Sequence, residues 1–513
     1  MQVKTDLSLV DTAEELATQG KYPQARTIYD QLLVSGVPKG IQSRIENGLG
    51  VIAAAEGHPA SSRLHFNRGL KAAECELVHR NQSLMIESFP SQGESVKVAI
   101  LSLLFNWPST GGGTVHTWEL AECLQKDGYQ VKHFYAVNES FGVGKVTEDL
   151  NYDSCPLQFS ESEWNAAQIR YRFQSAVKTF APDWVIVTDS WNTKPLLVEA
   201  VRDYPYFIRI AAEECLCPLN NVRMLFGESS DPGVLPPILQ CDQHQLESPQ
   251  ICRDCVKTHS SLSGGLHRAE RVLSGFEAEE YPDRLQQSFA EAEGVLVVNP
   301  SIAELIKPYT PAIHVVPSGF DTTRFPLEYS APPFKEGQKV RILFAGLCDE
   351  LMKGFHVLHA AAEQLWELRQ DFELWITREE RENDPDYFRS IGWQSQKELT
   401  EMMCQTDLLV FPTVAQEALG RSAVEAMGCG RPVIASRIGG LEWVIDHEQT
   451  GLLFAPGDVE DLCRQLQRLL DDNDLRVSLG KAGLKKFRSE FTWDVVMGRS
   501  YRPLLGTASK TEV

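Results

Sequence analysis

The chain of 513 residues exceeds the usual size of one domain, so we expect two or three domains, each with its own core. Its formal net charge of -21 argues against sequence-independent nucleic-acid binding, which needs a basic surface. The sequence has no apolar run of about 18 residues, as a transmembrane helix would need, and its acidic start is not typical of a signal peptide. We therefore expect a cytoplasmic protein.

The first stretch contains two similar segments, 16–33 and 53–70, offset by 37 residues. Small residues recur where helices would touch, and Tyr29 matches Phe66 among the large apolar ones. This pattern resembles the tetratricopeptide repeat. Residues 1–88 are therefore expected to form a helical repeat-like domain that leans on the next domain or binds a protein partner. The alternative is an ordinary four-helix cap.

Residues 95–325 and 338–491 each alternate buried-strand patterns with amphipathic helices. This alternation predicts two Rossmann-like domains, each with a doubly wound parallel sheet. A Pro-rich hinge joins them, and residues 492–513 are expected as a C-terminal helix and tail. Ligands of such sheets bind beyond the carboxyl ends of the strands, so the pattern predicts a site in the cleft between the domains. The expected strands are 96–105, the end of the segment 108–136, 183–189, 206–212, 294–300, 312–319, 340–347, 371–377, 407–412 and 431–440.

Two glutamates, Glu417 and Glu425, lie eight positions apart in the segment "QEALGRSAVEAMGCGRP". We expect "TVAQEALGRS" to be a loop after a strand and "AVEAMGCG" to be a short helix, with Glu425 two turns into it. The loop amides of Leu419, Gly420 and Arg421 then form an anion site at the helix start. A diphosphate at this loop, a ribose diol at Glu425 and a hexose at Glu417 together describe a nucleotide sugar.

The same region, "EALGRSAVEAMGCGRPVIASRIGGLEWVIDHEQTGLLFAPGD", resembles the E-x7-E signature of family-4 retaining glycosyltransferases of the GT-B fold. The resemblance extends over about 96–491 and is most specific in the last third. It implies that the C-terminal Rossmann-like domain binds the nucleotide sugar and that the N-terminal one faces the acceptor. It also implies UDP as the default nucleotide, with GDP next.

Other segments are similar to the same family. Gly112 and Gly113 lie in "STGGGTVHTWELAECL", which resembles the family's N-terminal glycine loop and lacks the G-x-G-x-x-G spacing of nicotinamide-binding loops. Lys353 lies in "FAGLCDELMKGFHVL", where its ammonium group would neutralise the departing diphosphate. The remaining donor-binding candidates are Gly346 in this segment and Gly392 and Trp393, whose backbone would contact the base.

Two positions depart from the family pattern. Cys348, or Leu347 by another alignment, stands where the family has an arginine, so one diphosphate cation is lost unless Arg421 or Arg437 replaces it. A histidine that the family often has near the sugar is also missing. Its place is taken by Ala212, Glu213 or Glu214.

From the resemblance we expect a retaining glycosyltransferase with Glu417 and Lys353 as catalytic residues and no catalytic divalent ion. It would transfer a hexose or N-acetylhexosamine to a glycan, lipid-linked or protein acceptor, in polysaccharide biosynthesis or protein glycosylation. The alternative is an inactive GT-B subunit that acts as a scaffold or chaperone for a partner transferase. A phosphorylase would need a pyridoxal lysine site, and no segment supplies one.

The twelve cysteines do not suggest a disulfide framework in a chain without a secretion signal. Five of them lie in a polar insertion at about 213–262. A C-x-x-C pair with two earlier cysteines predicts a structural zinc site, formed by Cys217, Cys241, Cys252 and Cys255, with Cys215 as a substitute. Because the spacing is not that of a standard zinc ribbon, free thiols, a disulfide and an iron–sulfur cluster stay open.

Overall fold

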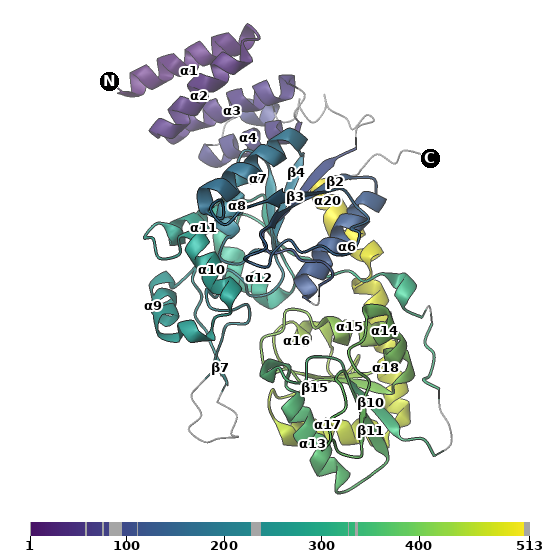
Figure 1. The fold of residues 1–513 in the computed structure, drawn as a ribbon. Coiled ribbons are helices and arrows are strands. Elements are labelled where there is room, and N and C mark those ends of the chain that lie inside the picture. The colour runs from purple at the N-terminus through teal and green to yellow at the C-terminus, as the bar shows by residue number, and fades with distance from the viewer. Residues whose placement is uncertain are drawn as a thin grey trace.

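The computed structural model describes residues 2–506 except 57–58, 74–75, 82–94, 110, 227–237, 327 and 334–336. A helical domain is followed by two α/β domains, one above the other in Figure 1. The expected end of the helical domain at residue 88 lies outside the described residues. None of the helices that the structure describes combines the length and apolar character needed to cross a membrane. The expected cytoplasmic location stays a prediction.

The N-terminal domain consists of helical hairpins with an apolar core of their own. Tyr29 and Phe66, which the repeat alignment equates, are both buried. Each packs against a glycine of α3: a Cβ at Gly48 would lie 2.4 Å from the Tyr29 hydroxyl oxygen, and one at Gly50 would lie 2.6 Å from the Phe66 ring. The likeness to tetratricopeptide repeats stays a prediction. The helices are α1 (Gln2–Thr18), α2 (Tyr22–Ser35), α3 (Lys39–Ala55) and α4 (Pro59–Ala72).

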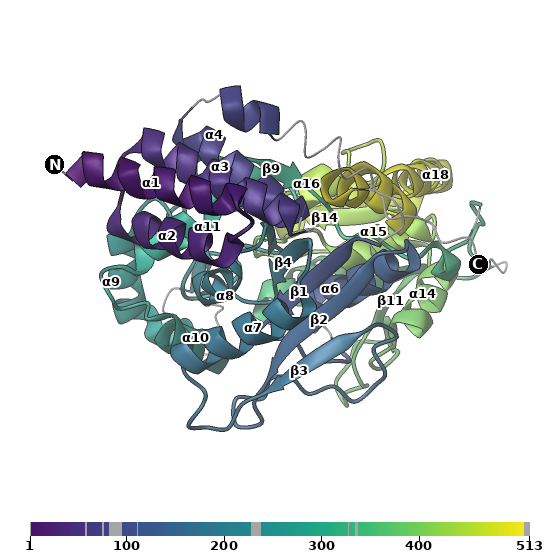
Figure 2. The same ribbon diagram turned by 90° about the horizontal axis from the view of Figure 1, so that it is seen from above.

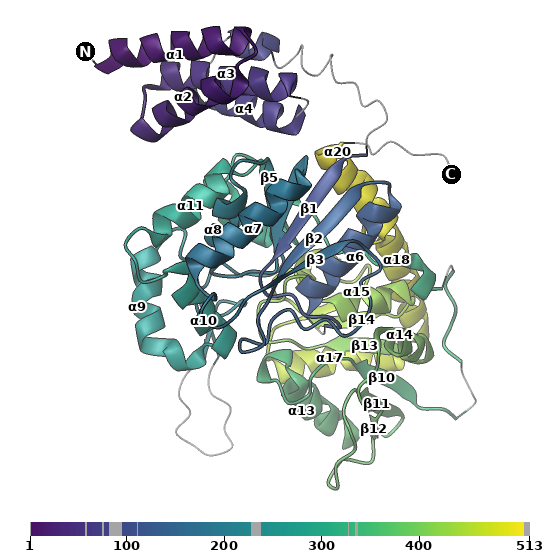
Figure 3. The same ribbon diagram turned by 45° about the horizontal axis from the view of Figure 1, so that its top comes forward.

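The helical domain leans on the first α/β domain, as expected. The Arg68 guanidinium donates a hydrogen bond of 2.7 Å to the carbonyl oxygen of Arg202, just after α8. Figures 2 and 3 show the helical domain over the side of that domain where α8 and α11 lie.

The first α/β domain is built on a seven-stranded parallel sheet in the order β3-β2-β1-β4-β5-β8-β9. Every residue of β4 and β5 is buried, Arg209 of β5 included, as expected for strands that are covered on both faces. The strands are β1 (Lys97–Ser102), β2 (Gln130–Val137), β3 (Ser154–Gln158), β4 (Trp184–Thr188), β5 (Tyr206–Ile210), β8 (Gly294–Val297) and β9 (Ile313–Val315). The helices are α6 (Gly112–Lys126), α7 (Ala166–Phe180), α8 (Lys194–Val201), α10 (Gly265–Ser274), α11 (Tyr281–Glu291) and α12 (Pro300–Ile306).

The second α/β domain has a six-stranded parallel sheet in the order β12-β11-β10-β13-β14-β15. Both sheets are Rossmann-like, so the predicted α/β architecture is confirmed. The strands are β10 (Val340–Phe344), β11 (Phe372–Ile376), β12 (Phe388–Ser390), β13 (Leu408–Phe411), β14 (Val433–Ser436) and β15 (Leu452–Phe454). The helices are α13 (Phe355–Trp366), α14 (Gln396–Gln405), α15 (Arg421–Gly428), α16 (Leu441–Val444), α17 (Val459–Asp471) and α18 (Asn473–Glu490).

The chain passes between the α/β domains twice, and the two crossings are hydrogen-bonded to each other. The Phe320 amide donates to the Phe491 carbonyl (2.8 Å), and the Trp493 amide donates to the Phe320 carbonyl (3.2 Å). Beyond this junction, α19 (Trp493–Val496), a π-helical turn (Met497–Tyr501) and α20 (Arg502–Leu505) return to the first domain. There Arg502 forms an ion pair with Asp127 of 2.6 Å.

A buried carboxyl group lies beneath the first turn of α6. Asp189 follows β4 and accepts a hydrogen bond from the Ser102 hydroxyl (3.1 Å). A Cβ at Gly113 would lie 3.8 Å from its Oδ1. Burial raises the pKa of Asp189 to about 6, although the hydrogen bond from Thr117 and the charge of Lys194 oppose the shift.

We predict that Asp189→Asn is increasingly favourable relative to the wild type as the pH rises. The folded-state pKa exceeds that of the unfolded chain, so the contribution of Asp189 to stability is full below pH 4 and is lost as the pH rises through about 6. The difference in unfolding free energy should change by roughly 2 kcal/mol between pH 4 and pH 7. Asparagine also suits the backbone φ of 37° at this position. Thermal melts across this range test the prediction, with exposed Asp203→Asn as control. A pH-independent difference would contradict it.

Candidate functional site

Lys353 reaches the cleft because its backbone packs tightly against the loop after β13. A Cβ at Gly354, whose φ is 71°, would lie only 1.8 Å from the Pro412 carbonyl oxygen. The Val414 amide and the Thr413 hydroxyl both donate to the Met352 carbonyl, at 3.0 and 2.9 Å. The close packing at Gly354 therefore fixes the point on the β10–α13 connection from which the Lys353 side chain extends.

A second close backbone approach holds the loop that carries Glu417. The Gly440 amide donates a hydrogen bond of 2.7 Å to the Glu417 carbonyl. A Cβ at Gly440 would lie 2.0 Å from the Ala418 carbonyl oxygen, and one at Gly439 would lie 2.5 Å from that of Glu417. From the first domain, the Asn299 side chain donates to the Ala418 carbonyl at 2.7 Å. The two glycines and Asn299 thus hold this loop from both sides of the cleft.

These contacts bring the two predicted catalytic residues together. The Lys353 ammonium lies 3.6 Å from a carboxylate oxygen of Glu417, and both side chains are partly exposed. Glu417 lines a small pocket between the domains, opposite Ala212 and Glu213. The place of the family's missing histidine therefore faces Glu417. The pocket is lined by Ala212, Glu213, Asn221, Asn299, Ser301, Ile302, Gln416, Glu417, Ala418 and Gly439.

Carboxylates shape the first-domain wall of this pocket. Glu214 turns away from the pocket and accepts hydrogen bonds from the amides of Ala211 (2.7 Å) and Ala212 (2.6 Å). Glu213 forms a buried ion pair of 2.9 Å with Arg223. Two acidic side chains thus brace the segment that faces Glu417.

Glu425 lies closer to the start of its helix than expected. α15 begins at Arg421 with Gly420 as its N-cap, so Glu425 stands about one turn into the helix rather than two. Leu419 is buried, and a Cβ at Gly420 would lie 2.6 Å from Leu441. The helix start that was predicted at Gly420 and Arg421 is thus present, and anion binding by its amides stays a prediction.

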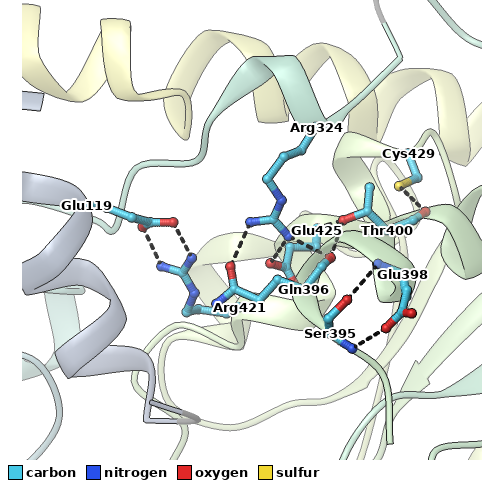
Figure 4. A network of polar contacts seen from close by, with 9 residues as sticks. All are labelled: Glu119, Arg324, Ser395, Gln396, Glu398, Thr400, Arg421, Glu425 and Cys429. Carbon is cyan, nitrogen blue, oxygen red and sulfur yellow. Dashed lines mark hydrogen bonds and ion pairs between the residues drawn. The ribbon is translucent and has the colours of Figure 1, made fainter. Parts of the chain in front are cut away.

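The Glu425 carboxylate is paired with an arginine from the interdomain linker. Arg324 contacts a carboxylate oxygen of Glu425 at 3.2 Å and also donates to Gln396 and Thr400 (Figure 4). One oxygen of Glu425 is thus held by a cation, and the carboxylate has a fixed orientation.

Arg421 forms an ion pair across the cleft. Its guanidinium meets the Glu119 carboxylate on α6 in two hydrogen bonds of 3.2 and 3.1 Å (Figure 4) and lies 4.6 Å from the centre of the Phe320 ring. Burial raises the pKa of Glu119 despite the guanidinium beside it. Burial also acts against the charged form of Arg421, but Glu119 and Glu425 hold its pKa above the ordinary value.

The predicted glycine loop is partly helical. Gly112 and Gly113 form the first turn of α6, with Gly111 as the N-cap. A Cβ at Gly112 would lie 3.1 Å from the Arg421 side chain, and one at Gly113 would lie 3.2 Å from Ala211. Both glycines therefore let α6 approach the opposite domain and the pocket wall closely.

The other donor-binding candidates lie around the carboxyl edge of the second sheet. Gly346 follows β10 and exchanges hydrogen bonds with the Thr377 hydroxyl. Gly392, with φ of 68°, donates its amide to the Arg378 carbonyl at 3.1 Å. The Trp393 side chain is 56% exposed, so it presents an uncovered ring beside this edge. Two arginines are candidates to replace the family's missing arginine at the diphosphate. Arg421 forms an ion pair with Glu119, and Arg437 is exposed.

Three contributors to the site carry no clear sequence signal. Glu119 looks like any polar position on an amphipathic helix, and Asn299 like an N-cap. Arg324 lies in the polar hinge, where a basic residue gives no indication of a buried partner. Each acts through a partner more than 100 positions away, at Arg421, Ala418 and Glu425 respectively.

Comparisons with known proteins agree with this architecture. Residues 339–472 match the family model described as glycosyl transferases group 1. The MMP alpha-(1->4)-mannosyltransferase of Mycolicibacterium hassiacum is 28% identical over 239 residues, which cover 44% of this chain and 54% of that protein. The chain spans about half the length of the curated relatives it matches.

Solved structures share the arrangement of the two α/β domains. The sucrose-phosphate synthase of Thermosynechococcus elongatus aligns with a TM-score of 0.56 and 18% identity, covering 80% of this chain and 99% of that one. The Anabaena protein HepE, solved in complex with UDP-glucose, aligns with a TM-score of 0.51 and 14% identity, also over 80% and 99%. The two α/β domains of this chain therefore have the GT-B fold, and the second of them matches the glycosyl transferases group 1 family.

Proposed function

We propose that this chain is a retaining glycosyltransferase that uses a nucleotide-diphosphate sugar. The observation that carries the proposal is the pairing of Lys353 with Glu417, 3.6 Å apart at the pocket between the domains. A cation beside a partly exposed carboxylate at the carboxyl edge of a sheet suits a substrate with an anionic group next to a sugar.

The donor would lie along the second domain. Its diphosphate meets the amides of Gly420 and Arg421 at the start of α15 and the ammonium group of Lys353. Its ribose meets Glu425, whose carboxylate is oriented by the ion pair with Arg324. Its hexose meets Glu417, facing Ala212 and Glu213. The base would lie near Gly392 and Trp393.

Transfer would depend on positioning and on charge stabilisation. As the bond from the sugar to the diphosphate breaks, negative charge grows on the leaving oxygen, and Lys353 offsets it. The leaving diphosphate would take the proton of the acceptor hydroxyl on the same face of the sugar, which retains the configuration. We expect no catalytic divalent ion, because the helix start and Lys353 supply the positive charge.

Uridine is the proposed base, supported by the UDP-glucose in the structure of the Anabaena relative of the same fold. The acceptor would be a hydroxyl of a glycan, a lipid-linked sugar or a protein. The helical domain is the proposed contact for an acceptor or a protein partner, because it leans on the acceptor-side domain. A non-catalytic scaffold would have no use for the Lys353–Glu417 pairing.

The donor is tested by calorimetric titration with UDP, GDP and ADP, each with and without EDTA. We expect UDP to bind most tightly, with the same affinity in EDTA. Lys353→Ala should weaken UDP binding about tenfold or more, because a charged contact to the diphosphate is lost. Exposed Lys397→Ala on α14 is the matched control. If no nucleotide binds to the folded wild type, the transferase proposal fails and the scaffold alternative gains support.

Catalysis is tested at Glu417. We predict that Glu417→Gln lowers UDP release from UDP-glucose, UDP-galactose or UDP-N-acetylglucosamine by about 100-fold or more while UDP still binds, because the negative charge beside the sugar is lost. Glu460→Gln, an exposed substitution on α17, should keep the full rate. An unchanged rate in the Glu417 variant would remove this residue from the mechanism.

A further inference from the structure

The segment 213–262 of the first α/β domain contributes Glu213 and Asn221 to the pocket, but its cysteines have no role in the proposed transfer. It contains a short antiparallel hairpin, β6 (Met224–Phe226) and β7 (Ile238–Gln240), followed by α9 (Pro249–His259). Cys217 precedes the hairpin and Cys241 follows it. Cys252 and Cys255 lie three positions apart on one face of α9.

Backbone hydrogen bonds bring the four cysteines into one cluster. The Cys241 amide donates to the Arg223 carbonyl, and the Gln245 amide donates to the Leu216 carbonyl, both at 2.9 Å. Cys252 interacts electrostatically with Cys217, Cys241 and Cys255, and those three also interact with one another. The hairpin and α9 therefore bring the four cysteines near one another, without their sulfur atoms converging on one point.

The backbone after Cys217 directs two donors at its sulfur. The amides of Leu219 and Asn220, two and three residues on, both donate to the Cys217 sulfur. Hydrogen bonds of this kind recur around sulfur ligands of metals.

Two buried arginines flank the cluster. Arg223 interacts with Cys252, and its Nη1 is buried without a hydrogen-bond partner. Arg271 interacts with Cys217, and its hydrogen-bond acceptors are the Pro218 carbonyl (2.8 Å) and the Ser263 hydroxyl (2.8 Å), both uncharged. Four thiolates around a divalent ion carry a net charge of about -2. The guanidinium of Arg271 offsets part of it, whereas the charge of Arg223 is shared with Glu213.

We propose that Cys217, Cys241, Cys252 and Cys255 bind one structural zinc ion. The arrangement in hand is open: within the described residues, no three Cys, His, Asp or Glu side chains are already set to hold a metal ion. Rotation about the cysteine side-chain bonds must therefore bring the sulfur atoms to about 2.3 Å from the ion. His244 is not a ligand, because its ring faces Glu247 and Tyr309.

A zinc ion here would fasten one wall of the interdomain pocket. The Glu213 amide donates to the Asn221 carbonyl (3.0 Å), and both residues line that pocket. Cys217 and Arg223 lie on either side of Asn221 in the chain. The zinc inference stands without the proposed transfer reaction, because it concerns the metal content and folding of this segment.

The proposal is tested by purifying the full chain in metal-free buffer and measuring its metal content by elemental mass spectrometry. We expect about one zinc per chain in the wild type. Cys241→Ser and Cys255→Ser, both at half-buried positions, should each lower it at least fivefold. Cys463→Ser on α17, also half-buried, is the matched control and should keep the zinc. Titration of the wild type with a mercurial should release the zinc and lower the melting temperature.

Three results would overturn the proposal, and none depends on a variant that folds. If the folded wild type contains no zinc and the thiols of all four proposed ligands react with an alkylating reagent, the cluster is reduced and holds no metal. A mass two units lower, with two thiols protected, would show a disulfide. Iron with visible absorption near 400 nm would show an iron–sulfur cluster. Nucleotide titration of the same sample reports separately on the transferase proposal.

Discussion

The ion pair between Arg421 and Glu119 is the contact on which the geometry of the cleft depends. It joins the first turn of α15 to α6 across the interdomain space, and Phe320 covers it. Removing one partner of a buried pair costs about 3–5 kcal/mol, so the pair strongly favours the observed approach of the two domains. The same approach places the amides of α15, the glycines of α6 and the pocket wall around one volume.

Around this pair, small residues rather than side-chain contacts set the positions of the reactive groups. Gly354 and Gly440 each bring one backbone so close to another that a Cβ would overlap a carbonyl oxygen. One of these contacts places Lys353 and the other Glu417. The lysine and the carboxylate come from different loops, and they meet because the loop of Lys353 packs against the start of the β13–α15 loop, which itself carries Glu417.

The sequence predicted most where its signal is local. Apolar runs such as those of β4 and β10 identify central strands. At the sheet edges, β3 was missed because it contains a proline and polar residues, β12 because it is short and partly polar, and β15 because it has only three residues. Glu417, Glu425 and Lys353 could be named from motifs. Their partners could not, since Glu119 and Arg324 act over 302 and 101 positions, and nothing in a local pattern reports such a pairing. The depth of Glu425 was overestimated, since only one helical turn separates it from the helix start at Arg421.

The two crossings between the α/β domains run beside each other, tied at Phe320, Phe491 and Trp493. Two separate linkers would let the domains rotate and translate independently, but two linkers that are hydrogen-bonded to each other act as a single hinge. The cleft then opens by rotation about this hinge, and the largest displacement occurs at the edge of the cleft that is farthest from it. A substrate would enter from that far edge, and the energy of closing would be concentrated in the few contacts that span it, with Arg421 and Glu119 among them.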